Sequence, residues 1–190
     1  MILRPSDYDF RFESGRICLD FAATRASRHA DALERWRDAA DLGRWLAASG
    51  LASRAPGLGE ADLATARALR EAIYRTVSAR RLGAPPAAAD VRLINAHAAD
   101  APLAPRLDPQ ARTRSLTAGA PFEAALSTIA RDAVDLVTGP GLGRVRECDE
   151  HTCSILFVDT SRPGKRRWCS MNRCGNRIKK AAFRARHRET

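Results

Sequence analysis

The sequence predicts a mainly α-helical protein in two parts, a helical bundle over residues 1–140 and a small cysteine-rich module over residues 144–190. Apolar residues recur at helical spacing through most of the first part. Gly139, Pro140 and Gly141 interrupt this pattern, and four cysteines follow the interruption. With 190 residues, 45% of them hydrophobic, the chain can bury one core of ordinary size and carry one small appendage.

Four segments of the first part have the periodicity of amphipathic helices. They are residues 38–49, residues 60–82, residues 86–100, and the stretch that Pro121 opens and that continues to residue 137. In the longest, Leu69, Ile73 and Val77 recur every fourth residue and define one buried face. Between the last two helices, residues 101–120 are rich in proline and predict a loop with one small hairpin.

The charge is concentrated at the C-terminal end. The net charge is +10, and residues 144–190 hold 13 Lys and Arg against 5 Asp and Glu. This asymmetry favours a basic segment for a polyanion over a protein that seeks membranes. The charged first twelve residues lack the apolar region of a signal peptide and no stretch is apolar enough to span a bilayer, so we expect a cytoplasmic protein without a membrane partner.

The four cysteines predict a metal site. Cys148 and Cys153 form one pair, Cys169 and Cys174 the other, with four residues inside each pair and fifteen between them. Such sets hold one structural zinc ion, Zn2+, with sulfurs at about 2.3 Å, and a closed four-thiolate site leaves no position for catalysis. We therefore expect no enzyme. The alternatives are an iron–sulfur cluster, a redox dithiol, or a set in which a histidine replaces one thiolate.

The segment between the two pairs predicts the shape of the module. Residues 154–159 are rich in β-favouring side chains, residues 160–164 have turn composition, and residues 165–168 read as a return strand. The second pair leads into a basic helix over residues 174–188. The order of knuckle, β-hairpin and helix is that of a treble-clef-like zinc finger, which a bound metal would stabilise by on the order of 10 kcal/mol.

The hairpin and helix carry the candidate nucleic-acid-binding residues. They are Lys165, Arg166, Arg167, Arg173, Asn176, Arg177, Lys179, Lys180, Arg184 and Arg186. We expect most of them to contact phosphates and Arg173, Asn176 and Arg177 to read base edges. Asn176 could instead cap the helix, and Arg177 could pair with a carboxylate of the bundle such as Asp20.

The module resembles the CGNR zinc-finger family. The resemblance rests on the tetrapeptide Cys174-Gly175-Asn176-Arg177, on Arg167-Trp168-Cys169-Ser170-Met171, and on the upstream cysteine pair with the residues that follow it. Members of that family commonly carry in front an all-helical ABATE domain and are described as bacterial, stress-induced transcription regulators. Residues 17–24, 41–46 and 69–74 are similar to that domain, although Ala23 stands where its first motif has Asn.

The expected function is therefore a DNA-binding transcription regulator, in which zinc fixes a basic hairpin and helix against DNA. The helical part would sense a small-molecule effector or assemble a homodimer, and Asp20 and Trp45 are the candidate ligand or domain contacts. An RNA-binding module is the first alternative, because short four-cysteine fingers with arginine-rich helices also bind RNA. The second is a protein-interaction module in which the finger docks on the helical part.

Overall fold

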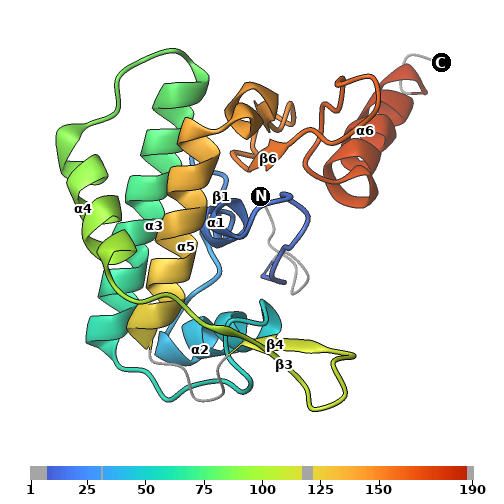
Figure 1. Ribbon diagram of the computed structural model, residues 1–190. Coiled ribbons are helices and arrows are strands. Elements are labelled where there is room, and N and C mark those ends of the chain that lie inside the picture. The colour runs from blue at the N-terminus through green and yellow to red at the C-terminus, as the bar shows by residue number, and fades with distance from the viewer. Residues whose placement is uncertain (1–7, 31, 117–121, 188–190) are drawn as a thin grey trace.

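The computed structural model describes residues 8–30, 32–116 and 122–187, and this part of the chain is mainly α-helical, as predicted (Figure 1). Its helices are α1 (Ile17–Ala22), α2 (Ala39–Ala48), α3 (Glu60–Arg81), α4 (Ala88–Ala99), α5 (Phe122–Thr138) and α6 (Asn176–Arg186). A 3-10 turn, η2 (Pro140–Arg144), and a π turn, η3 (Met171–Gly175), complete the helical elements. The strands pair in twos: β1 (Arg25–Ala26) with β2 (Leu33–Glu34), β3 (Pro105–Leu107) with β4 (Arg114–Leu116), and β5 (Val145–Glu147) with β6 (Leu156–Val158).

Helices α3, α4 and α5 lie side by side and form the body of the bundle, with α1 against α3 and α5 (Figure 1). The predicted face of α3 is confirmed, because Leu69, Ile73 and Val77 are completely buried. On α5, Ile129 and Leu136 are buried in the same core. Burial of such side chains contributes about 1.5–3 kcal/mol each, so this interface provides much of the stability of the helical part.

The four predicted helices of the first part correspond to α2, α3, α4 and α5. Helix α2 begins after Asp38, whose side chain accepts a hydrogen bond from the Asp41 N–H at 2.7 Å, and Gly50 beyond its end has a positive φ of 77°. The small hairpin predicted between residues 101 and 120 is present as β3 and β4. Pro121, predicted to open α5, lies outside the described residues.

Helix α1 was not predicted from the sequence. It has six residues, too few to show a helical period, and contacts from distant residues fix its first turn. Asp132 of α5 accepts hydrogen bonds from the Arg16 side chain at 2.8 Å and from the Cys18 N–H at 3.0 Å. Cys18 is completely buried in the core.

The hairpin of the cysteine-rich module has a different partner strand from the predicted one. Strand β6 pairs with β5, in antiparallel register from Val145 opposite Val158 to Glu147 opposite Leu156, so the first cysteine pair lies in the loop of the hairpin. The return strand predicted over residues 165–168 is wrong. That segment instead lies beside the knuckle, where the Asp149 N–H donates to the Arg167 carbonyl at 2.9 Å. Both edges of β6 already have partners, because β5 pairs with one edge and the Ser14 carbonyl accepts the Val158 N–H at the other.

Candidate metal centre and basic helix

The four predicted cysteines come together in one buried cluster. Their sulfurs all lie within 4.8 Å of one another. The Sγ of Cys169 is 3.8 Å from that of Cys153 and 3.6 Å from that of Cys174. Tetrahedral zinc with bonds of about 2.3 Å requires sulfur–sulfur separations of about 3.8 Å. The donor set and its spacing therefore fit one structural zinc ion.

Each cysteine is positioned by a different local element. Cys148 directly follows β5, and Cys153 lies three residues before β6, so the antiparallel pair brings the two ends of the knuckle together. Cys174 lies in the π turn that leads into α6, and Cys169 precedes this turn. The Cys169 N–H also donates to the Cys148 sulfur at 3.4 Å, a bond of the kind that orients a metal ligand.

The chemistry of the cluster favours binding of a cation. Hydrogen bonds from the other sulfurs lower the pKa of Cys148, and the corresponding bonds raise the pKa of Cys153. Four like charges at these separations repel one another, so in the absence of a cation the cluster keeps protons on part of its sulfurs. Zinc supplies the positive charge that stabilises all four thiolates.

The metal site shares a small core with the helical part. Ala23, Ala26, Ile155 and Phe157 pack in one buried cluster with the four cysteines. Ala23 is the position at which the resembled motif has Asn, and its carbonyl accepts a hydrogen bond from the buried Arg35 at 2.7 Å. The substitution therefore falls at the contact between the two parts of the chain.

Asp20 supports this contact indirectly. Its carboxylate accepts the Ser14 N–H at 3.0 Å, and the Ser14 carbonyl accepts the Val158 N–H of β6 at 2.8 Å. Asp20 is 7% exposed, and burial raises its pKa to about 6 although the hydrogen bonds from Ser14 act in the opposite direction. Asp20 thus fixes the backbone segment against which the finger docks.

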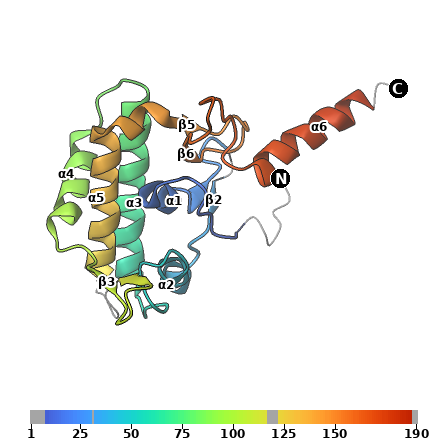
Figure 2. The same ribbon diagram turned by 45° about the vertical axis from the view of Figure 1, so that its right-hand side comes forward.

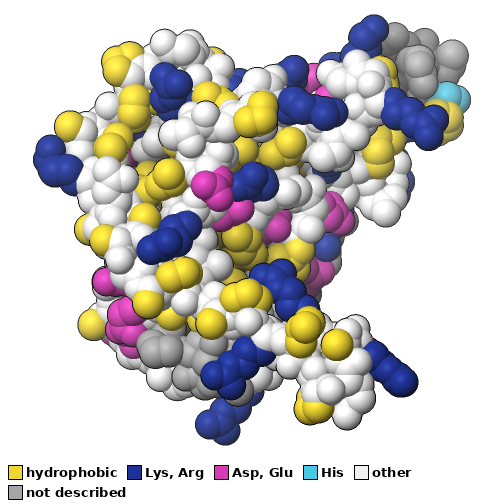
Figure 3. Space-filling view, in the orientation of Figure 1, with side chains coloured by type: hydrophobic (Ala, Val, Ile, Leu, Met, Phe, Trp, Pro, Cys, Tyr) yellow, Lys and Arg dark blue, Asp and Glu magenta, His cyan; other side chains and the backbone are white. Residues whose placement is uncertain are grey.

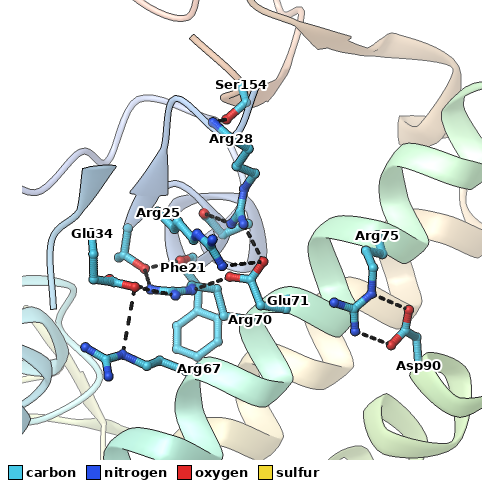
Figure 4. Close-up of polar contacts among 12 residues, drawn as sticks. Phe21, Arg25, Arg28, Glu34, Arg67, Arg70, Glu71, Arg75, Asp90 and Ser154 are labelled. Carbon is cyan, nitrogen blue, oxygen red and sulfur yellow. Dashed lines mark hydrogen bonds and ion pairs between the residues drawn. The ribbon is translucent and has the colours of Figure 1, made fainter. Parts of the chain in front are cut away.

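A partly buried ionic network supports a second docking point (Figure 4). The Arg28 N–H donates to the Ser154 Oγ of the knuckle at 3.0 Å, while the Arg28 guanidinium pairs with Glu71 of α3. Arg70, 1% exposed, makes two hydrogen bonds to Glu34 at 2.6 and 2.7 Å and one to Glu71 at 2.9 Å. The network holds the β1–β2 pair, and with it the knuckle, against α3.

Glu147 at the end of β5 provides a third docking point. Its carboxylate oxygens lie 2.6 Å from the Arg81 guanidinium at the end of α3 and 2.6 Å from His29 Nε2. The finger therefore contacts the helical part through the knuckle and its two strands, whereas docking of the finger was expected from the sequence only as part of an alternative function.

Some of the predicted nucleic-acid-binding residues make contacts within the finger itself. The Arg166 side chain donates to the carbonyls of Trp168 and Cys169, and its guanidinium lies over the Phe157 ring. Its N–H donates to Asp159, whose pKa is lowered by hydrogen bonds from Ser161 and from this N–H. Arg166 thus closes the turn between β6 and the second cysteine pair.

Three further arginines of that set have acidic neighbours. Arg167 pairs with Asp149 at 2.7 Å. Arg173 lies 3.7 Å from Asp9. Arg177 lies 3.7 Å from Glu150, a knuckle residue whose side chain is 3% exposed. The carboxylate beside Arg177 thus comes from the finger, whereas Asp20, the partner suggested from the sequence, accepts from Ser14.

The remaining cations lie on the outer surface. Lys165, Lys179, Lys180 and Arg184 are exposed, and among the described residues they have no ion-pair partner. Helix α6 extends away from the bundle, and Lys and Arg side chains lie along its end of the molecule (Figures 2 and 3). The Asn176 amide donates to the Asn172 carbonyl at 3.4 Å. The side chain of Arg186 lies outside the described set.

Two other side chains have defined places. Phe183 on α6 is 55% exposed and stacks on His187, with ring centroids 3.9 Å apart. Trp45, a candidate ligand or domain contact, is completely buried and packs edge-on against Phe21 and Trp36. An aromatic cluster of this kind stabilises the core by about 0.5–1.5 kcal/mol per pair beyond the burial of its area.

Sequence reasoning missed the residues that dock the finger. Ser14, Arg28, Arg81, Glu147 and Ser154 meet across the contact although they are far apart in the chain. The only local signal was the position of Glu147 and Ser154 beside cysteines. Charged and hydroxyl side chains are common on surfaces, so their pairing is visible only in three dimensions.

Comparisons with known proteins agree with this architecture. The family model ABATE, described as "Putative stress-induced transcription regulator", matches residues 15–140. The model of the CGNR zinc finger matches residues 144–187. The search among curated proteins gives no match. Within the described residues, no helix is long and apolar enough to cross a membrane. The chain therefore belongs to the ABATE family, with a CGNR zinc finger following the ABATE region.

Proposed function

We propose that this protein is a zinc-dependent transcription regulator that binds DNA through α6 and the turn at Lys165. The observation that carries the proposal is the division of the basic residues. Arg166, Arg167, Arg173 and Arg177 lie beside groups of the protein itself, whereas Lys165, Lys179, Lys180 and Arg184 have no acidic partner among the described residues. Unpaired cations on a projecting helix suit phosphate contacts.

The rigid mounting of the finger supports the same function. Zinc would be held by the four cysteines, and α6 begins two residues after the last of them. The three docking points on the helical part then fix the direction of the helix, because the knuckle and both strands are anchored. Phosphate contacts at fixed positions would set the register of α6 on the DNA. From that register, Asn176 or Phe183 could reach a groove.

One basic helix makes a small interface, and specific sites on DNA usually require more buried surface. We therefore include in the proposal a homodimer that places two α6 helices on one duplex. A two-fold symmetric site selected from a random pool is the expected sign of this arrangement, and a site without symmetry contradicts the dimer while leaving DNA binding intact.

The test uses full-length, zinc-loaded protein and fluorescence anisotropy with a randomised duplex across a salt series. About six neutralised phosphates predict a logarithmic salt slope of roughly −5. Reversing the charge at four α6 positions should weaken binding by at least about 100-fold and reduce the slope by roughly 3 to 4. The substitutions are Lys179→Glu, Lys180→Glu, Arg184→Glu and Arg186→Glu.

A matched control changes the net charge equally at exposed positions far from the finger. Its substitutions are Arg54→Glu, Arg92→Glu, Arg106→Glu and Arg112→Glu. If both variants lose the same affinity, the effect is one of total charge and α6 is not the contact. Unchanged affinity of the α6 variant, with zinc and fold retained, contradicts the proposal, and stronger competition by matched RNA than by DNA assigns the surface to RNA instead.

A further inference from the structure

The bundle contains a cavity to which the two family descriptions assign no role. It has a volume of about 550 Å³ and lies between α3, α4 and α5. Most of its lining is apolar, from Ile73, Val77, Val91, Ile94, Val134 and Val137. This volume is within the range of about 300–1,000 Å³ that is usual for small-molecule sites, and the mostly apolar lining is also typical of them.

The packing of α4 explains why the space is left. On this helix only Asp90 and Ile94 are buried, and the neighbouring Ala88 and Ala89 are small and exposed. Asp90 accepts two hydrogen bonds from Arg75 of α3, at 2.6 and 2.8 Å (Figure 4). A polar pair thus attaches the first turn of α4 to α3 and holds the two helices together without filling the space between them.

One buried polar group in the lining lacks a partner. Thr76 on α3 is 5% exposed, and its Oγ1 has no hydrogen-bond partner within the described part of the chain. Buried hydroxyls are normally hydrogen-bonded, because an unmet donor or acceptor is costly in a low-dielectric interior. Because this oxygen has almost no accessible surface, a bound molecule would reach it through the χ1 rotation that exchanges the hydroxyl and methyl groups of Thr76.

The charge of the lining residues favours an anionic polar group on the bound molecule. Arg80 also lines the cavity, is exposed to solvent, and has no carboxylate within ion-pairing distance among the residues described. No lining residue is acidic. Thr76 and Arg80 are four residues apart on α3, so their side chains lie on one face, one turn apart. One carboxylate could accept hydrogen bonds from both.

We propose that this cavity binds a small, mostly apolar carboxylic acid. Its apolar body occupies the space between α3, α4 and α5, and its carboxylate accepts hydrogen bonds from the Thr76 hydroxyl and the Arg80 guanidinium. The site differs from the one expected from the sequence, because Asp20 and Trp45 do not line it. The ligand fills a void and satisfies a buried hydroxyl in one step.

The cavity lies at the end of the bundle that carries the finger. Thr138, which also lines it, is the last residue of α5 and precedes η2 and β5. Next to Arg80 in the chain, Arg81 pairs with Glu147 of β5 at 2.6 Å. A ligand that moves the end of α3 or α5 therefore acts on the support of the finger, and only this consequence rests on the proposed function.

The test titrates the full-length, zinc-loaded protein with 4-phenylbutyrate and with 4-phenylbutan-1-ol, which has the same apolar body without the charge. Calorimetry and NMR shift changes report binding. We expect saturable binding of the carboxylate with a dissociation constant on the order of 1 mM or lower, and at least about tenfold weaker binding of the alcohol.

Two variants on α3 test the assigned contact. Thr76→Val removes the hydroxyl at nearly constant volume, so it should weaken phenylbutyrate about tenfold while raising the melting temperature of the free protein. Thr65→Val is the matched control, because Thr65 is exposed on the same helix, bonds to the Ala61 carbonyl and does not line the cavity. It should leave phenylbutyrate binding unchanged.

The outcomes separate this proposal from the one on DNA. No saturable binding up to about 10 mM, equal affinity for acid and alcohol, or unchanged affinity of Thr76→Val overturns the assignment. A folded Val134→Phe variant, in which the ring fills the cavity, must also lose phenylbutyrate. The α6 charge-reversal variant should bind phenylbutyrate as the wild type does, so failure of DNA binding leaves this result standing.

Discussion

The buried carboxyl of Asp20 makes the stability of the protein depend on pH in a definite direction. Burial is the main reason that its pKa rises from 3.8 to about 6 on folding, and the negative charges of Asp132 and Glu13 add to the effect. Between these two values the folded chain holds a proton that the unfolded chain has released. This contribution to stability is therefore fully present below about pH 4, falls as the pH rises, and is lost above about pH 6.

The size of the effect follows from the two pKa values. A difference of about 2 units corresponds to about 3 kcal/mol, of which roughly 2 kcal/mol falls between pH 4 and pH 7. Asp20→Asn keeps an oxygen that can accept the Ser14 N–H but does not titrate. Relative to the wild type, this variant should therefore become more stable by roughly 2 kcal/mol as the pH is raised from 4 to 7.

Urea unfolding at a series of pH values, followed by tryptophan fluorescence, measures this difference. Trp36 and Trp45 are completely buried in the helical part and report its unfolding. Release of zinc at low pH affects both proteins, so it cancels in the comparison. A difference in unfolding free energy that stays constant within about 0.5 kcal/mol from pH 4 to 7 would refute the raised pKa.

Two further predictions concern the metal and the ionic network. Cys153→Ser should abolish stoichiometric zinc binding and the ordered packing of the finger while the bundle stays folded. Metal analysis measures the zinc content, and near-ultraviolet circular dichroism reports the packing. Full zinc content in the variant contradicts the four-cysteine site. Arg70→Met should cost about 1–3 kcal/mol in chemical denaturation, because Glu34 and Glu71 lose their buried hydrogen-bond donor while Glu71 keeps Arg28, whereas the exposed control Arg54→Met should change stability by less than about 0.5 kcal/mol. Equal effects of the two substitutions would exclude a structural role for the network.

The helices and the metal donors were predictable because their signals are local. Leu69, Ile73 and Val77 lie on one face by the helical period alone, and this face is buried in the structure. The spacing of the two cysteine pairs likewise favoured a four-sulfur site over the alternatives, and the four sulfurs meet. In these cases the structure is determined by residues close together in the sequence or by the metal-binding preference of one set of ligands.

Other features depended on residues distant in the sequence. The residues of β6 favour a strand, but its pairing with β5, and the contact of the Arg167 carbonyl with the Asp149 N–H, appear only in the tertiary structure. Nine of the ten nucleic-acid-binding candidates are Lys or Arg, and only tertiary contacts separate Arg166, which closes a turn, from Lys179, which remains exposed.

The sequence by itself thus determined the mainly helical architecture, the metal chemistry and the basic character of the last helix. The tertiary structure decided how the finger docks, why the pKa of Asp20 is raised and where a cavity remains beside Thr76. The physical reason is that periodicity and donor spacing are encoded in neighbouring residues, whereas burial, ion pairing and empty volume depend on which distant surfaces meet.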